Sequence, residues 1–191
     1  MCERFIFNYP TTWVLKERIA GMNTDGWTIE DERGQPVATI QAHKQRRDIP
    51  MRFLDAKSGQ EIFTGQWDTN FSSVWKYYVQ ENGQTVYTMR NDIPSWPMGW
   101  SCYRGMVNHN GEADNPLVFE APAPGCCGRQ STWVDARGDE VADVEVNSLQ
   151  SDFQTYTAEV EPGVNSALVW AMVIAKDAFR DKSHSNQQVM Y

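Results

Sequence analysis

Three histidines are the side chains of this sequence best suited to moving a proton near neutral pH: His43, His109 and His184. His109 lies in the polar stretch VNHNGEADN, where Asp114, or Glu112 in its place, could orient the imidazole. A loop histidine beside a carboxylate can act as a general acid or base. The stretch therefore predicts His109 and Asp114 as the catalytic pair if the protein is an enzyme, although it is also typical of an ordinary polar turn.

Sequence motifs for a nucleophile, a metal or a cofactor are absent. Ser131 is not in a GxSxG elbow, and the chain has neither HExxH nor GxxxxGK[ST]. The four cysteines lack the spacing of metal ligands, so we expect reduced thiols, with the Cys126-Cys127 pair in a surface loop. A redox or soft-metal role for that pair is the weaker alternative. The sequence predicts neither a bound metal nor a cofactor.

Aromatic residues suggest a ligand site. Trp96 and Trp100 in SWPMGW, with Tyr103 nearby, could line an apolar pocket with polar tips. They could equally close one end of the fold, and the sequence leaves these two interpretations open.

A basic cluster, AHKQRRD, offers a second kind of binding. Arg46 and Arg47 can grip a phosphate group through paired hydrogen bonds, and Lys44 supplies a compact positive charge. The cluster therefore predicts an anionic head group as a partner. The alternative is a solvated loop whose charges pair with neighbouring acids.

Composition limits the classes of partner. The chain has 191 residues and a formal charge of −8, with 17 basic against 25 acidic side chains, which argues against nucleic acid as a partner. Aromatic residues make up 12% and apolar residues 41%, so the chain is expected to fold. The N-terminal residues do not resemble a signal peptide, and we expect a cytoplasmic protein without stable membrane insertion.

The elements that must position these residues begin with the run VNSALVWAMVIA, residues 164–175. A membrane span needs about 20 apolar residues, so this run is too short and is more typical of a buried helix. Pro162-Gly163 precedes it, and Asn165 or Ser166 could cap it. A helix that is apolar on every side must be surrounded by other structure. We expect residues 1–181 to form one domain and residues 182–191 to be a flexible tail.

Upstream of this helix the chain is patterned as β-hairpins. Glycine-containing turns between β-rich arms predict four hairpins, and shorter runs predict four single strands. The hairpins cover residues 27–42, 51–66, 74–90 and 131–146, and the single strands cover Arg4–Phe7, Trp100–Val107, Pro116–Glu120 and Phe153–Val160. About twelve antiparallel strands can close into a barrel too wide for strand side chains alone to fill. We therefore predict a mainly β fold, a closed barrel of about twelve strands that encloses the C-terminal helix.

The same segments carry a resemblance. The order WTIEDERGQPVATIQ, MRFLDAKSGQEIFT and then SLQSDFQTYTAEVEPGVNSALVWAMVIAKDAF resembles the LURP-one-related family of the tubby C-terminal-like superfamily, which includes phospholipid scramblases. The resemblance implies a twelve-stranded barrel around a C-terminal helix, with an Asp after the helix, here Asp177. Tubby domains bind phosphoinositide head groups. Scramblases add a membrane segment and a cysteine-rich lipidation stretch, and the lack of both here argues against scramblase activity.

Three classes of function remain after this reasoning. The favoured one is a binding module that takes a lipid or an apolar small molecule in a pocket at the end of the barrel. The alternative is a cofactor-independent enzyme, such as a cyclase or isomerase, with an aromatic pocket and His109 as acid or base. A purely structural partner protein is the third.

Overall fold

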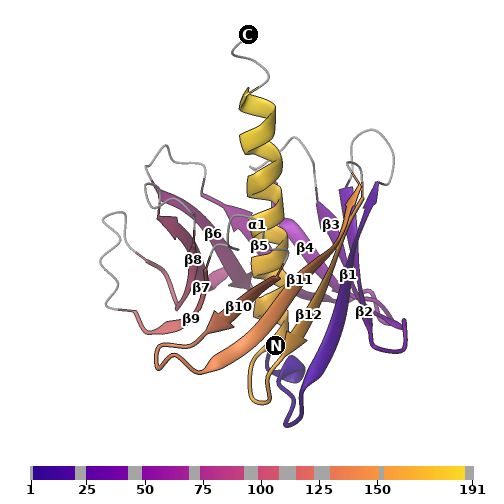
Figure 1. Ribbon diagram of the computed structural model, residues 1–191, viewed down its shortest axis with the longest axis horizontal. Coiled ribbons are helices and arrows are strands. Elements are labelled where there is room, and N and C mark those ends of the chain that lie inside the picture. Colours follow the sequence, from indigo (N-terminus) through magenta and orange to yellow (C-terminus); the bar gives the residue numbers. More distant parts are fainter. Residues whose placement is uncertain are drawn as a thin grey trace.

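The computed structural model describes residues 2–19, 25–42, 49–68, 74–92, 99–107, 115–122, 130–150 and 153–187. Within this part of the chain, twelve strands form one closed antiparallel barrel, in which each strand pairs with its neighbours in sequence and β1 pairs with β12 (Figure 1). A short 3-10 helix, η1 (Cys2–Phe5), precedes the strands, and the helix α1 (Ser166–Gln187) follows them. The predicted fold class, mainly β with a closed twelve-stranded barrel and one C-terminal helix, is confirmed.

The strands have the following bounds: β1 (Thr11–Ile19), β2 (Asp25–Asp31), β3 (Pro36–Ala42), β4 (Met51–Asp55), β5 (Glu61–Trp67), β6 (Val74–Glu81), β7 (Gln84–Asp92), β8 (Trp100–Arg104), β9 (Leu117–Ala121), β10 (Gln130–Val134), β11 (Glu140–Gln150) and β12 (Phe153–Val160).

All four predicted hairpins are present, because their turns carry residues suited to positive φ. Asn82 and Gly83, for example, have φ angles of 50° and 76°, as a two-residue hairpin turn requires. The strand predicted at Arg4–Phe7 is wrong, because residues 2–5 form η1 and Phe5 packs against the helix instead. Conversely, β1 was not predicted, since charged residues in its second half interrupt the β-rich pattern. The predicted number of strands was therefore right although one strand was misplaced.

The two ends of the barrel differ in their connections. At one end, which we call the turn end, short turns at residues 32–35, 56–60, 82–83 and 135–139 join consecutive strands. The β8–β9 connection and the start of α1 are at the same end. At the other end, the loop end, the described strands stop at the segments 20–24, 43–50, 68–73, 93–99 and 122–129. Figure 1 shows the N-terminus at the turn end and the last turns of α1 extending beyond the strands at the loop end.

Near the turn end, β-bulges insert extra apolar residues into five of the strands. Five of the six register shifts in the described ladders insert one extra residue shortly after a turn-end connection: Val37, Ile62, Val86, Val118 and Val141. All five belong to the hydrophobic core or pack against it. A bulge bends its strand and increases its twist. Each bulge therefore adds one apolar side chain to the interior at this end.

The helix α1 is buried over its first half, as its apolar sequence predicts. Residues 167–175 are each at most 2% exposed, and they share one core cluster with residues of the strands. The Asn165 side chain accepts a hydrogen bond from the Ala167 amide at 3.1 Å and caps the helix. Buried Asp177 accepts a hydrogen bond from the Tyr156 hydroxyl at 2.6 Å. No helix within the described residues is both long and apolar enough to cross a membrane.

The helix continues to Gln187 and so extends into residues 182–191, for which the sequence predicts a flexible tail. Residues 188–191 lie outside the described part of the chain.

Candidate functional site

Most of the predicted site residues lie outside the described part of the chain. These are Lys44, Arg46 and Arg47 of the basic cluster, Trp96 of the aromatic group, and His109, Glu112 and Asp114 of the acid–base group, together with Cys126 and Cys127. The phosphate-binding and catalytic roles given to them stay predictions.

Trp100 and Tyr103 are described, and both lie in β8. Trp100 is 3% exposed and belongs to the core, with ring centroids 6.0 Å from Trp67 and 5.8 Å from Phe179. Because side chains alternate along a strand, half-buried Tyr103 lies on the opposite face of the sheet. The two residues therefore lie on different faces of the sheet, and Trp100 is a core residue. The ligand-binding role given to the aromatic group stays a prediction.

The strand β8 also separates the two predicted loops. Trp100 begins β8 at the loop end, and Arg104 ends it at the turn end. The segment with Trp96 therefore connects to the first of these ends, and the segment with His109 and Asp114 follows the second. Trp100 and the start of the His109 segment are therefore at opposite ends of β8.

The described chain has a pocket of about 400 Å³ at the turn end. Its lining comes from η1 and the residue after it, from β7, β8, β9 and β11, from the β10–β11 turn, and from the start of α1 with the turn before it. The lining residues are Glu3, Ile6, Tyr87, Arg104, Val118, Phe119, Asp135, Arg137, Asp139, Glu140, Val141, Glu161, Pro162, Gly163, Val164, Asn165 and Leu168. We call this cavity the turn-end pocket.

The turn-end pocket lies where the wall of the barrel is irregular. Two bulge residues, Val118 in β9 and Val141 in β11, are among its lining. Between them, β9 and β10 are joined by a single residue pair, Val134 with Glu120. Bulges that bend strands away from regular pairing are common beside functional sites. Weak pairing between two bulges accounts for a hollow at this position.

The β10–β11 turn forms a charged rim of the turn-end pocket. Asp135 accepts hydrogen bonds from the backbone amides of Arg137 and Asp139 at 2.8 and 3.1 Å, and the Arg137 guanidinium lies 3.0 Å from both carboxylates. The amide of Arg137 is the largest cause of a lowered pKa for Asp135, because it stabilises the carboxylate. Asp135 therefore stays ionised, and Arg137 is neutralised within its own turn.

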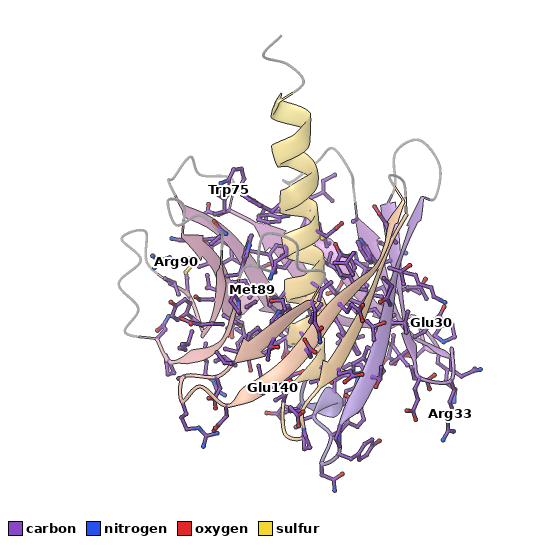
Figure 2. All side chains as sticks on the ribbon, in the orientation of Figure 1. Glu30, Arg33, Trp75, Met89, Arg90 and Glu140 are labelled. Atoms are coloured by element: carbon purple, nitrogen blue, oxygen red, sulfur yellow. The ribbon has the colours of Figure 1, made fainter. Side chains whose placement is uncertain are left out.

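Four other charged residues line the turn-end pocket, and the described chain gives none of them an ion-pair partner: Glu3, Arg104, Glu140 and Glu161. All four are exposed. In Figure 2, Glu140 lies toward the turn end, whereas Trp75 lies toward the loop end. The turn-end pocket thus combines apolar side chains with an acidic rim.

Cys102 is the cysteine that the structure describes as a free thiol, and it is fully buried in β8. Burial raises the pKa of this thiol far above its usual range, because the thiolate would lose its hydration. Cys102 is therefore suited to packing rather than to nucleophilic chemistry.

At the loop end, Lys176 of α1 has an unusual environment. Its ammonium lies 5.2 Å from the centre of the Trp133 ring and 3.5 Å from the Pro122 carbonyl oxygen. Burial lowers the pKa of Lys176 from 10.5 to about 8, because the charged form is poorly solvated there. Below pH 8 the side chain is protonated in both the folded and the unfolded state, so folding must bury an ammonium and the protein loses stability.

The Lys176→Met variant is expected to be more stable than the natural protein at pH 7, by about 1 to 2 kcal/mol. The gain is below the full value for the pKa change, because the ring and the carbonyl also favour the ammonium. In the natural protein the unfolded state binds more protons between pH 8 and 10.5, so stability should rise with pH there, and this rise should be missing in the variant. Urea denaturation from pH 7 to 10 measures both effects.

Lys57→Met is the matched control, since Lys57 is an exposed lysine in the β4–β5 turn. It should keep the natural rise in stability with pH. Identical pH profiles for the two variants would contradict the assigned environment of Lys176.

Comparison with known proteins gives a family match for this chain. No curated protein and no solved structure matches the chain significantly. The family model described as LURP-one-related matches residues 11–177, from the first residue of β1 to the buried Asp177. The matched region includes all twelve strands and the buried half of α1, and on this evidence the chain belongs to the LURP-one-related family.

Proposed function

We propose that the protein is a non-catalytic binding module, whose barrel encloses α1 and whose turn-end pocket takes a small molecule with an apolar body. The observation that carries the proposal is the turn-end pocket itself, a cavity of about 400 Å³ between two bulges. Ligand pockets commonly measure about 300 to 1,000 Å³.

The helix supports a ligand site at an end of the barrel rather than in its interior. Residues 167–175 are buried on every side of the helix, and Trp170 makes edge contacts with Phe5 and Trp13. An interior occupied by a helix has no room for a second occupant. A ligand can instead cover Ile6, Val118 and Val164, which line the turn-end pocket and are exposed or half-buried.

An anionic lipid head group would need a different place. The segment with Lys44, Arg46 and Arg47 joins β3 to β4 at the loop end, between Ala42 and Ile49. The acidic rim of the turn-end pocket would repel a phosphate. The strand ends that flank the predicted head-group residues, Ala42 and Met51, lie at the opposite end of the barrel from the turn-end pocket, so the two proposed sites do not depend on each other.

Ile6→Trp is expected to weaken ligand binding by about 10-fold or more, because Ile6 lines the turn-end pocket and the larger indole would occupy part of it. The side chain is 44% exposed, so the fold should tolerate the change. Phenylbutanol is a suitable neutral probe, with an expected dissociation constant of about 1 mM or lower for the natural protein. Titration followed by NMR shift changes measures it.

Met106→Trp is the matched control. Met106 is 63% exposed near the same end of the barrel but does not line the turn-end pocket. This variant should bind the probe as the natural protein does. Equal binding by the Ile6→Trp variant, or no saturable binding by the natural protein, would reject the proposal.

A further inference from the structure

We infer that the ligand of the turn-end pocket is an organic cation, with an ammonium or guanidinium head on an apolar body. The inference rests on the proposed function. It comes from the charges of the lining, which holds the carboxylates Glu3, Asp135, Asp139, Glu140 and Glu161 but only two basic side chains, Arg104 and Arg137.

The charges that are already paired do not decide the class of ligand. Arg137 contacts both Asp135 and Asp139 at 3.0 Å, so this turn has no positive charge to offer. The remaining lining charges are Glu3, Glu140 and Glu161 against Arg104. A cation that enters the turn-end pocket thus meets three carboxylates without ion pairs in the described chain, and an anion meets one guanidinium.

The start of α1 is the feature of the turn-end pocket that most favours an anionic ligand, but its amides and its dipole offer little to an anion. The positive end of a helix dipole attracts negative charge, and Asn165 and Leu168 line the turn-end pocket. However, the Ala167 amide donates to the Asn165 side chain, and the Leu168 amide donates to the Asn165 carbonyl at 3.0 Å. Two of the first-turn amides that could hold an anion are therefore occupied. The dipole also amounts to about half a charge, against three full carboxylate charges.

The geometry also explains why the ligand needs an apolar body. Exposed carboxylates attract a small cation only weakly in water, and salt screens the attraction. Apolar contact with Ile6, Val118 and Val164, which keep accessible surface, can supply the rest of the affinity, and a simple metal ion cannot make this contact. The class of ligand is therefore an amphipathic amine or guanidine rather than an inorganic cation.

Three probes with one common body test the inference: phenylbutylamine, phenylbutanol and phenylbutyrate, titrated by NMR at pH 7 and low salt. The amine should bind about 10-fold more tightly than the alcohol, and the carboxylate should bind more weakly than both. The Glu140→Gln/Glu161→Gln variant should reduce amine binding to the level of the alcohol and leave alcohol binding unchanged.

Glu32→Gln/Glu159→Gln is the matched control, because it removes the same two charges from exposed residues that do not line the turn-end pocket. It should keep the preference for the amine. Equal binding of amine and alcohol by the natural protein, or tightest binding of phenylbutyrate, would overturn the inference while the proposed function stands. If none of the three probes binds, both fail.

Discussion

Replacing Trp170 with alanine is expected to lower the free energy of unfolding by about 3 to 5 kcal/mol. The indole is fully buried near the start of α1, with its ring centroid 4.8 Å from Phe5 and 4.9 Å from Trp13. The three rings come from α1, η1 and β1, so no single element can move to fill the space. Chemical denaturation measures the loss as a lower midpoint with an unchanged slope.

Trp170→Phe is the matched control for this loss. The indole nitrogen of Trp170 is buried without a hydrogen-bond partner in the described chain, so phenylalanine removes volume but breaks no hydrogen bond. We expect this variant to lose less than half of what the alanine variant loses. A midpoint unchanged by Trp170→Ala would contradict the burial of the helix.

Gly65→Ala is expected to cost about 3 kcal/mol, at the upper end of the usual range for overpacking. Gly65 lies in β5, and a Cβ at this position would overlap the hydroxyl and ring of Tyr77. The ring cannot move aside easily, because Tyr77 is fully buried, lies 5.2 Å from Trp67 and donates its hydroxyl hydrogen to the Met51 sulfur at 3.5 Å. Thermal and urea denaturation both measure the change.

A double-mutant cycle with Tyr77→Leu separates steric overlap from loss of strand stability. In the Tyr77→Leu background, Gly65→Ala should cost about 1 kcal/mol or less, because the overlapping atoms are gone. An equal cost in both backgrounds would show that Tyr77 is not the cause. On this account, position 65 requires glycine because a side chain would overlap Tyr77, and not because the backbone needs a conformation special to glycine.

The parts of the fold that local patterns encode were predictable. Turns such as Asn82-Gly83 and the apolar run 164–175 have short-range signatures, and both were found. β1 was missed because charged residues in its second half interrupt the β-rich pattern. η1 was missed because the fate of Phe5 depends on contact with Trp170, a residue more than 160 positions away. Local pattern cannot reveal such a contact.

The bulges have a sequence signal, a pair of adjacent apolar residues, that a search for strict alternation misses. Each bulge residue is followed by an inward-facing Ala, Phe or Tyr, in the pairs Val37-Ala38, Ile62-Phe63, Val86-Tyr87, Val118-Phe119 and Val141-Ala142. Two adjacent apolar residues after a turn break the period of two. A search for this doublet would have indicated the bulged strands, and one of the five doublets, Val118-Phe119, lines the turn-end pocket with both of its residues.

The turn-end pocket itself could not be predicted from sequence, because its lining is assembled from distant segments. Glu3, Arg104 and Glu161 have no common motif and meet only once the barrel closes. The separation of the two described residues of the predicted aromatic group has a simpler reason. Alternation along β8 places Trp100 and Tyr103 on opposite faces, and that rule was available from the predicted strand.

The pairing of β1 with β12 has a consequence for the newly made chain. Every other ladder joins strands that are consecutive in sequence, so it can form as soon as both strands leave the ribosome. The first strand must wait for Phe153–Val160, which at roughly 5 to 20 residues per second takes on the order of ten seconds. During that time the edge of β1 that later pairs with β12 has no partner strand. The charged run Lys16-Glu17-Arg18 on the same strand would discourage other nascent chains from adding to this edge.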